Sequence, residues 1–371
     1  MKSQATPALN KGIKKRVFIG ISGGVDSSVA AAMLLKAGYD VTGVFIKVWQ
    51  PDWLECTWKE ERRDAMRVAA HLGIPFVTLD LEKEYKRDVV DYMLSEYRAG
   101  RTPNPDVMCN KAVKFGGFYS WAIKQGADFV ATGHYAEIKN GALYVSRDSN
   151  KDQSYFLWTL RPEQLKHILF PIGHLTKPEV RKLAGKFNLP TATKKDSQGI
   201  CFIGMVDMKT FLSHYIEATE GNVLNSSGSI IGTHPGAVFF TIGERHGFTI
   251  KEKSPDDQPL YVLSKNMQNN IITVGERGDE RTTKDASVVT TVPSIAISQT
   301  NWLGEVPSVG KVYRARSRYR QELVNMVFSK IDGEGSHAEV VFKNTQEVIA
   351  PGQSLVIYDG DICIGGGIIE G

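Results

Sequence analysis

The stretch RVFIGISGGVDSS, residues 16–28, decides the fold of the amino-terminal part of the chain. It joins an apolar run typical of a buried strand to the start of an amphipathic helix. Between the two, Gly23 and Gly24 permit a sharp turn in which consecutive backbone N–H groups face one anion. Ser22 and Ser27 add hydroxyl donors, and the helix start adds its positive end. The stretch therefore predicts a strand–turn–helix that binds phosphate.

The loop differs from two common nucleotide-binding motifs. It lacks the lysine of the G-x-x-x-x-G-K-[ST] loop and the spacing of the G-x-G-x-x-G dinucleotide fingerprint. A loop without that lysine suits enzymes that cleave ATP between its α- and β-phosphates and release pyrophosphate. Asp26 can hold Mg²⁺ together with the phosphates, or it can simply occupy a favourable place in the first turn of the helix.

The pattern around this loop predicts a doubly wound α/β domain with a mostly parallel sheet. Strands are expected at 16–21, 41–48, 75–80 and 129–132, and helices at 25–36, 57–72, 84–98, 177–187 and 208–216. Asn140-Gly141 predicts a hairpin turn between 136–138 and 143–145.

The character of the sequence changes near residue 219, where helical periodicity gives way to short alternating runs. We expect a flexible tail over 1–15 and the catalytic α/β domain over 16–218. A small central β-rich domain is expected over 219–282, and a β-barrel over 283–371.

Composition is ordinary for a globular protein, with 42% hydrophobic and 23% charged residues. No apolar run approaches the length of a membrane span, and the first 15 residues lack the apolar core of a signal peptide. The four cysteines stand far apart without a C-x-x-C pair, which disfavours a disulfide framework or a zinc ribbon. We therefore expect a cytoplasmic protein with reduced thiols and no membrane association. The net charge of +4 is compatible with nucleic acid but does not indicate it.

Two of the cysteines have the surroundings of reactive thiols. Cys109 ends the stiff loop RTPNPDVMC, just before a helix expected from Lys111, whose dipole would favour thiolate. Asp106 stands three residues earlier, close enough to exchange protons with a reacting base. Cys201 lies in the polar loop KKDSQGIC, where two lysines can lower its pKa. The other two cysteines, Cys56 and Cys363, are expected to be buried and inert.

Seven motifs in one order resemble those of the bacterial tRNA-specific 2-thiouridylases. These are GISGGVDSS (20–28), GRTPNPDVMCN (100–110), ATGHY (131–135), KDQSYFL (151–157), KKDSQGICFIG (194–204), RSRYR (316–320) and PGQS (351–354). The resemblance covers about residues 15–370. That family belongs to the N-type ATP-pyrophosphatase superfamily, and the resemblance implies an adenine nucleotide α-hydrolase-like fold.

The resemblance also implies a reaction. ATP adenylates the C2 carbonyl oxygen of the wobble uridine, position 34 in the anticodon stem-loop of tRNA. Cys201 carries a persulfide received from a sulfur-donor protein, such as a cysteine desulfurase or a sulfur relay protein, and AMP departs as sulfur enters. Cys109 attacks the inner sulfur, which leaves a transient Cys109–Cys201 disulfide. Asp106 is the candidate general acid/base.

Binding residues follow from the same resemblance. The residues implied to contact ATP, which is accompanied by Mg²⁺, are Gly20, Ile21, Ser22, Gly23, Gly24, Val25, Asp26, Ser27, Ile46 and Gly133. Ile46 stands where the family often has methionine, and it still offers the adenine an apolar face. The residues implied to contact tRNA are Asn104, Pro105, Asp106, His134, Lys151, Asp152, Gln153, Arg318, Tyr319 and Gln353.

The carboxyl-terminal region carries a basic cluster with one aromatic residue. If 314–320 is a strand, its alternate arginines at 314, 316, 318 and 320 share one face and suit phosphate contacts. Tyr319 would then be available to stack on a base. A solvated edge strand is the alternative interpretation.

Three other functions remain open on the sequence. A synthetase of the same superfamily would use a nitrogen nucleophile and would not need Cys109 and Cys201. An iron–sulfur thiolase would use these two cysteines as cluster ligands, with Cys56 or Asp106 completing the set. An RNA-binding module without catalysis would release neither AMP nor pyrophosphate.

Overall fold

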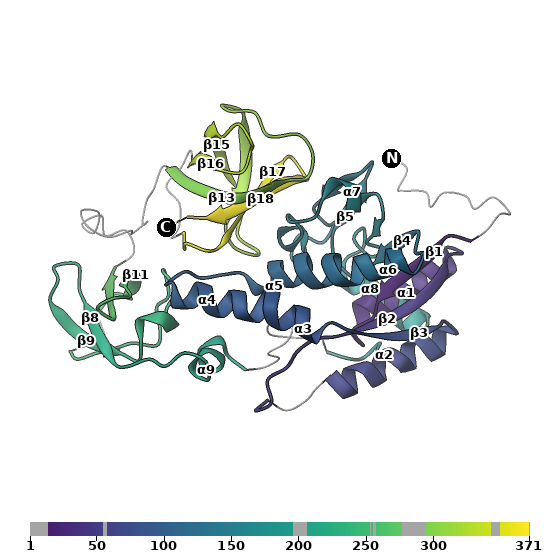
Figure 1. Ribbon diagram of the computed structural model, residues 1–371, viewed down its shortest axis with the longest axis horizontal. Helices are drawn as coiled ribbons and strands as arrows, with labels where there is room; N and C mark the ends of the chain where they lie inside the picture. The colour runs from purple at the N-terminus through teal and green to yellow at the C-terminus, as the bar shows by residue number, and fades with distance from the viewer. Residues whose placement is uncertain are drawn as a thin grey trace.

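The computed structural model describes residues 14–54, 58–195, 206–252, 254, 257–276, 294–342 and 349–370. Three sheets account for the strands in these ranges. A parallel sheet lies at one end of the molecule and a smaller mixed sheet at the other, while an antiparallel sheet lies above the helices between them (Figure 1). The predicted order of an α/β domain, a small β-rich domain and a carboxyl-terminal barrel is confirmed.

The first sheet has five parallel strands in the order β3-β2-β1-β4-β7. Their bounds are β1 Arg16–Gly20, β2 Asp40–Lys47, β3 Phe76–Asp80, β4 Phe129–Ala131 and β7 Ile168–Leu169. The strand order reverses between β1 and β4. In open α/β sheets, ligands bind at the carboxyl ends of the strands beside such a reversal.

Helices cover both faces of this sheet, as the alternating pattern predicted. One face packs against α1 (Val25–Lys36), α2 (Trp58–Leu72) and α8 (Lys177–Lys186). The other packs against α3 (Glu82–Tyr85), η1 (Lys86–Asp91), α4 (Tyr92–Arg98), η2 (Cys109–Phe118), α6 (Tyr119–Lys124) and α9 (Met208–Ser213). The short helix α5 (Pro105–Met108) runs directly into η2. Each face therefore has its own apolar core.

The middle sheet has the order β10-β9-β8-β12-β11. Its strands are β8 Gly221–Leu224, β9 Ile230–His234, β10 Thr249–Ile250, β11 Tyr261–Asn266 and β12 Ile271–Gly275, with the short helix η4 at Ala237–Phe239. A separate small cluster of apolar side chains forms its core. This separate core is typical of a domain that folds around its own sheet.

The third sheet closes into a barrel. Its strands are β13 Ser294–Trp302, β14 Val312–Arg316, β15 Val324–Ile331, β16 Ala338–Phe342, β17 Ser354–Asp359 and β18 Ile362–Ile369. These six pair in the order β13-β16-β15-β14-β17-β18, and β13 also pairs with β18. Closure satisfies the hydrogen bonds of every strand edge in the ring.

One hairpin of the amino-terminal part extends this barrel sheet. Strands β5 (Glu137–Lys139) and β6 (Ala142–Tyr144) form the predicted hairpin, in which Asn140 has φ 52° and Gly141 has φ 78°. Strand β6 then pairs with β18 of the barrel. The sequence did not predict this pairing, because the two strands lie more than 200 residues apart. The helices η3 (Ser154–Phe156) and α7 (Pro162–Leu165) follow the hairpin.

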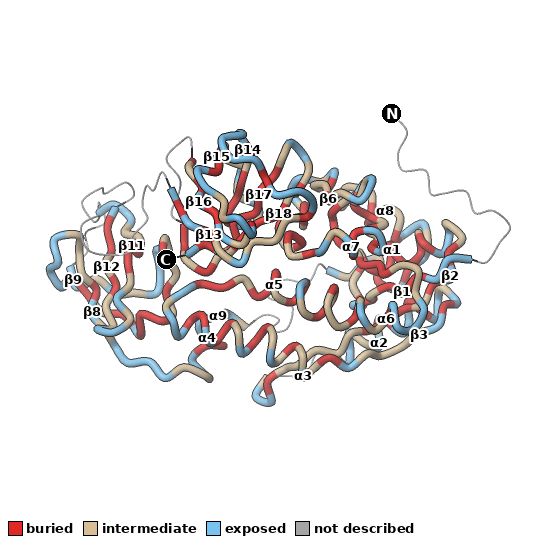
Figure 2. Tube along the Cα trace, turned by 45° about the horizontal axis from the view of Figure 1, so that its top comes forward, coloured by how far each residue is buried: buried red, intermediate tan, exposed pale blue. Residues whose placement is uncertain are grey.

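Burial follows the three sheets and the helices that connect them. Buried residues run along the strands and along the helical segment that leads through α4 and α5 between the sheets (Figure 2). None of the helices within the described residues is both long enough and apolar enough to cross a membrane.

Candidate active site

The nucleotide loop leaves the carboxyl end of β1 and enters α1, as predicted. Gly23 has φ 76°, and a Cβ added there would meet the carbonyl oxygen of Glu61 at 2.6 Å. Glycine is thus required at this position both for its backbone conformation and for the close approach of α2. Gly24 caps α1 with an extended backbone and no side-chain hydrogen bond. The first N–H groups of α1 are therefore not capped by a side chain and face the loop.

Hydroxyl groups line the same turn. The Ser22 and Ser27 hydroxyl oxygens lie 3.3 Å apart, and the Ser22 backbone N–H donates to the Ser27 oxygen. The Ser27 and Ser28 hydroxyls both donate to the carbonyl of Gly24, at 3.3 and 2.7 Å, and Ser28 also receives a hydrogen bond from Thr191. Ser22 and Ser27 are the two hydroxyls at the turn that can reorient toward a phosphate.

Asp26 has a cationic partner that the sequence did not predict. The Lys177 Nζ lies 2.8 and 2.9 Å from the two Asp26 carboxylate oxygens, and the Tyr135 hydroxyl donates to one of them at 2.9 Å. Lys177 is the first residue of α8, 151 positions from Asp26 along the chain. The structure therefore brings to the loop a lysine that the loop sequence lacks.

The other implied nucleotide contacts flank the loop. A Cβ on Gly133 would lie 2.6 Å from the backbone nitrogen of Ser27, so the segment after β4 packs directly on the start of α1. Ile46 is half-buried near the carboxyl end of β2, and its Cδ1 lies near Gly20. The loop, Gly133 and Ile46 thus lie together at the edge where the strand order reverses.

The last described residues before Cys201 lie beside the nucleotide loop. Residues 196–205, including Cys201, lie outside the described residues. Just before them, the Lys194 Nζ donates to Asp64 of α2 at 2.8 Å, and Arg181 donates to the carbonyl of Lys194. The ion pair lowers the pKa of Asp64, with the hydrogen bond from Lys194 as the main cause. Asp64 also neighbours Gly23, so Lys194 is held close to the loop.

Cys109 lies within a helical segment, whereas the sequence predicted that it would lie just before one. The helix begins at Pro105 rather than near Lys111, because Asn104 caps it by accepting from the Val107 backbone N–H at 3.2 Å. Cys109 therefore lies beyond the first turn, where the effect of the helix dipole has largely faded. Its side chain is 3% exposed and packs in the apolar cluster that also contains Phe211 of α9.

Asp106 and Cys109 share one face of this helix. Residues three apart on a helix are neighbours, so the carboxylate and the thiol lie on the same side. Asn110, the next residue, donates its side-chain amide to the carbonyl of Asp106, while its buried side-chain oxygen has no hydrogen-bond partner among the described residues. Of the other cysteines, Cys363 is buried as expected, and burial raises its pKa to about 12. Cys56 lies outside the described residues.

His134 is buried and neutral. Burial, and secondarily the charge of Lys114, lowers its pKa well below the usual value. The Lys114 Nζ lies 3.2 Å from Nε2, and the Thr132 hydroxyl lies 2.7 Å from Nδ1. Since an ammonium group can only donate, Nε2 accepts and Nδ1 carries the proton toward Thr132. His134, in the segment that follows Gly133, thus accepts a hydrogen bond from Lys114 of η2. Only 6% of the histidine surface is exposed.

The segment Lys151–Gln153 joins the α/β domain to the barrel. Asp152 is 4% exposed and forms an ion pair with Arg316, which is 7% exposed. The Tyr358 hydroxyl lies 2.8 Å from the same guanidinium. Gln153 accepts from the Tyr135 backbone N–H at 2.9 Å. Asp152, which the resemblance implied as a tRNA contact, is therefore enclosed by protein in this structure, while Lys151 is half-buried.

The predicted stripe of arginines on one strand is wrong. Strand β14 ends at Arg316, and the chain turns so that Arg320 adopts φ 64°. Arg316 points into the buried network, whereas Arg318 is exposed. The Tyr319 ring packs on Phe156, with the ring centroids 4.7 Å apart, and the residue remains partly exposed. The turn residues after β14 broke the strand periodicity on which the prediction depended.

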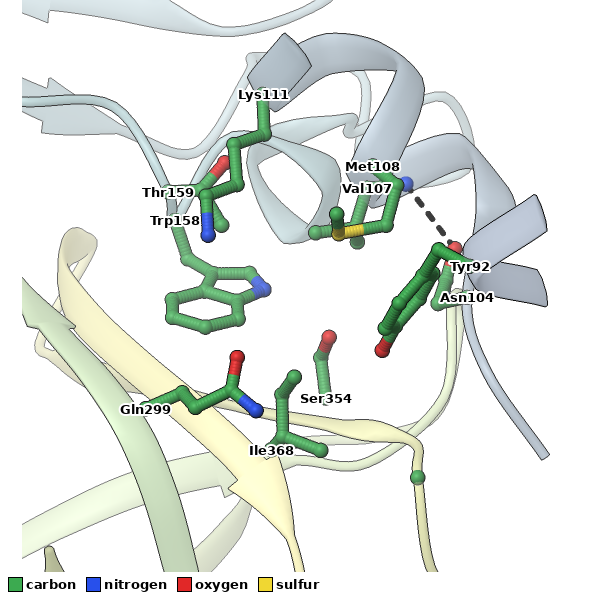
Figure 3. Close-up of a pocket in the computed structure, with 11 residues that line it drawn as sticks. Tyr92, Asn104, Val107, Met108, Lys111, Trp158, Thr159, Gln299, Ser354 and Ile368 are labelled. Atoms are coloured by element: carbon green, nitrogen blue, oxygen red, sulfur yellow. Dashed lines mark hydrogen bonds between the residues drawn. The ribbon is translucent and has the colours of Figure 1, made fainter. Parts of the chain in front are cut away.

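Gln353 lies where the barrel meets the loop before α5. Its side-chain amide donates to the carbonyls of Thr102 and Pro103, at 2.8 and 3.3 Å. A small cavity opens beside this contact, between the α5–η2 helix and the barrel (Figure 3). Its lining includes Asn104 and Lys111, together with Trp158, whose buried indole nitrogen has no hydrogen-bond partner in the part of the chain that the structure describes. The cavity has room for about one water molecule, about 10 Å³.

The residues that sequence reasoning missed are mostly cations from distant segments. Lys177 and Lys114 were not identified as site residues, yet they contact Asp26 and His134. Arg316 was expected to contact phosphate, and its pairing with Asp152 was not predicted. The capping box of Thr176 and Glu179 marked the start of α8, so the sequence could place Lys177 at a helix end. It could not indicate which loop that end would face.

Three family models match consecutive parts of the chain. The model described as tRNA methyl transferase HUP domain matches residues 15–205, just over half of the chain. The model described as tRNA methyl transferase PRC-barrel domain matches 209–276, and the one described as aminomethyltransferase beta-barrel domain matches 292–369. The three ranges follow the three sheets in order.

Similar proteins extend over nearly the whole chain. A protein of Streptococcus mutans named tRNA-specific 2-thiouridylase MnmA is 46% identical over 368 residues, 96% of this chain and 95% of its own length. A protein of the same name from Lacticaseibacillus paracasei is 46% identical over 364 residues, 96% and 94% of the two chains. Among solved structures, a U34-tRNA thiolase NcsA from Methanococcus maripaludis with its [4Fe-4S] cluster aligns at 18% identity and a TM-score of 0.36. That alignment covers 55% of this chain and 65% of the other.

Proposed function

The chain belongs to the family of tRNA-specific 2-thiouridylases, and we propose a residue-level course for the sulfur transfer to tRNA that this family performs. The enzyme is a sulfurtransferase that uses ATP. In our proposal the C2 carbonyl oxygen of the wobble uridine attacks the α-phosphate of ATP and releases pyrophosphate. The adenylate turns a poor leaving group into a good one. The sulfur then replaces the oxygen, and AMP departs.

Cys201 carries the incoming sulfur in this scheme. Its persulfide, loaded by a sulfur-donor protein, attacks C2 through the terminal sulfur. The Cys109 thiolate attacks the Cys201 sulfur and breaks the S–S bond, so that the terminal sulfur remains on the base. The product is a Cys109–Cys201 disulfide, which a dithiol reductant returns to two thiols with two electrons. Such cycling suits a reducing cytoplasmic compartment.

The two ends of the 196–205 segment support this pairing of thiols. At one end, Lys194 is tied to Asp64 beside the nucleotide loop. At the other, α9 contributes Phe211 and Leu212 to the apolar cluster that contains Cys109. The described residues that flank 196–205 therefore lie beside the nucleotide loop on one side and in the apolar surroundings of Cys109 on the other. This is the observation on which the proposal chiefly rests.

Asp106 is the proposed general acid/base, since it shares a helix face with Cys109. Asp26 is the proposed carboxylate for Mg²⁺. Asp26 would hold the ion together with the phosphates; no group of three metal-ligating side chains occurs among the described residues. That arrangement fits Mg²⁺, which is usually held by one or two carboxylates and substrate phosphates. When bound, the ion neutralises the developing charge on the pyrophosphate.

The proposed tRNA contacts fall into two groups. Asn104, Pro105 and Asp106 lie at the start of the helix that carries Cys109 and are proposed to face the target base, which must leave its stack to react. Lys151, Arg318 and Tyr319 are proposed to meet the RNA backbone or neighbouring bases. We propose that His134, Asp152, Gln153 and Gln353 act mainly by positioning these segments, since each is engaged with protein.

Mass spectrometry of nucleosides tests the scheme. Unmodified tRNA is incubated with protein, ATP and a persulfide source, and the digest is analysed for 2-thiouridine. We expect product with the unaltered protein, none with Cys201→Ser, and no multiple turnover with Cys109→Ser. Cys363→Ala is the matched control, because its buried thiol has a pKa of about 12 and should be dispensable. Thiolation by Cys201→Ser would refute the assignment, and visible absorption of an active, anaerobically purified protein would favour the iron–sulfur alternative.

A further inference from the structure

We propose that Lys177 is the cation that binds pyrophosphate at the nucleotide site. The phosphate-binding loop itself contains no lysine that could do so. The inference rests on the proposed adenylation and names the residue that holds the leaving group. In this proposal Lys177 pairs with Asp26 in the ligand-free protein. It exchanges that carboxylate for the β- and γ-phosphate oxygens when ATP binds.

The position of Lys177 supports this role. Its ammonium lies 2.8 Å from one oxygen of Asp26, a residue in the first turn of α1 that the phosphate-binding loop leads into. The lysine side chain is 13% exposed and that of Asp26 is 32% exposed. An ammonium ion at this depth, next to the N–H groups of a helix start, strengthens the attraction for an anion.

Lys177 is also held rigidly at its backbone. Its N–H donates to an oxygen of Asp148 at 2.9 Å, and the preceding Thr176 forms a capping box with Glu179. Val180 and Ala184 of the same helix are buried in the core that α1 shares. Only the side chain of Lys177 can therefore move appreciably. A short side-chain rotation suffices to change its partner, without movement of α8.

The exchange of partners follows from the charges involved. Bound ATP brings several negative charges and a divalent cation to a loop that has one carboxylate. Asp26 then faces the metal ion, which it binds more strongly than an ammonium group because Mg²⁺ is a small, hard cation. Lys177, left without its carboxylate, pairs with the phosphate oxygens, for which a lysine acts as a point charge. Asp26 and Lys177 each keep a partner of opposite charge in both states.

A purely structural ion pair is the competing explanation. A partly exposed pair contributes little to stability, typically about 0–1 kcal/mol. Moreover, α8 is already fixed by its capping box and its buried side chains. A lysine used only to hold the helix would not need to face the phosphate-binding loop.

Binding of inorganic pyrophosphate to the full-length protein, measured by calorimetry, tests the proposal. Lys177→Gln keeps a donor that can face Asp26 but removes the charge, and we expect it to weaken pyrophosphate binding about tenfold or more. Lys177→Arg should restore most of the affinity. Lys182→Met is the matched control, because Lys182 is exposed on the same helix, and its affinity should stay within about twofold of the unaltered protein.

The same comparison in an Asp26→Asn background keeps the test valid if Lys177→Gln alone does not fold. An amide at position 26 leaves no unpaired carboxylate, so the loss caused by Lys177→Gln should persist there. Equal pyrophosphate affinities with and without Lys177, in either background, overturn the proposal. Release of pyrophosphate by the unaltered protein in the presence of tRNA is measured in parallel. Its absence would refute the proposed function itself, rather than the role of Lys177.

Discussion

The nucleotide end of the molecule and the junction between the α/β domain and the barrel use charged residues in opposite ways. At the nucleotide end, Asp26 and Lys177 remain partly exposed and lie where a ligand can separate them. At the junction, Asp152 and Arg316 are enclosed and bound to each other. The comparison teaches that a charged residue in a motif can either bind a ligand or stabilise the fold. The exposed fraction of its side chain distinguishes the two roles. Four measurements test this distinction.

The largest expected effect concerns the buried pair at the junction. Arg316→Met leaves Asp152 buried without a counter-charge, so we expect the free energy of unfolding to fall by about 3–5 kcal/mol. Denaturation followed by tryptophan fluorescence measures this loss. Arg314→Met is the control, because Arg314 lies on the same strand but is 41% exposed, and roughly 0–1 kcal/mol is expected.

Two further results sharpen this first test. The double variant Arg316→Met/Asp152→Asn should be more stable than Arg316→Met, because the buried charge is gone. ATP affinity should be unchanged in all folded variants if the junction serves the protein and not the nucleotide. Equal stability of the single and double variants would contradict the assignment of a buried ion pair.

The next effect concerns the backbone of the nucleotide loop. Gly23→Ala introduces a Cβ at φ 76° and 2.6 Å from a carbonyl oxygen. The left-handed conformation alone costs about 1–2 kcal/mol, so we expect ATP affinity to fall about tenfold or more. Gly24→Ala is the matched control, since φ there is −89° and the nearest atom is 3.4 Å away. Similar affinities for the two variants would mean that the loop tolerates displacement.

A third measurement uses pH. Native His134 has a pKa below that of the unfolded chain, about 6.5, so the unfolded state binds the proton first. Stability should therefore decline as pH falls below 6.5, by up to about 1.4 kcal/mol per pH unit, until the native residue also titrates. Thermal melting of the protein and of His134→Gln across pH 7 to 5, in roughly half-unit steps, isolates this contribution. His234, whose pKa is also lowered, titrates in both proteins. Identical pH profiles would exclude a buried neutral His134.

The smallest expected effect concerns Gln353. Gln353→Ala removes two hydrogen bonds to the loop before α5 and should cost about 1 kcal/mol. We expect the KM for tRNA to rise several-fold while ATP affinity stays the same, because only the junction is loosened. Gln268→Ala, at an exposed position of the middle domain, serves as the control. A change in ATP affinity instead would show that the two regions are coupled.

The sequence by itself determined the elements that depend on neighbouring residues. The strand–glycine–helix stretch at 16–28 fixed the phosphate-binding loop, and Asn140-Gly141 fixed the hairpin turn. The same local reasoning placed the start of α8 at Lys177. These predictions are confirmed because turn geometry, helix capping and periodicity depend on residues that are close in the sequence. Family membership also followed from the sequence, because several motifs occur together in one order.

Only the tertiary structure decided which distant side chains meet. It joined Lys177 to Asp26 and Arg316 to Asp152, and it added β6 to the barrel sheet beside β18. Two boundaries that the sequence analysis missed have local causes instead: the Asn104 cap begins the helix of Cys109 at Pro105, and the turn after Arg316 ends β14. Contacts between residues more than 100 positions apart depend on how sheets and helices pack as bodies. Local propensity does not encode that packing, so it could identify the charged residues but not their partners.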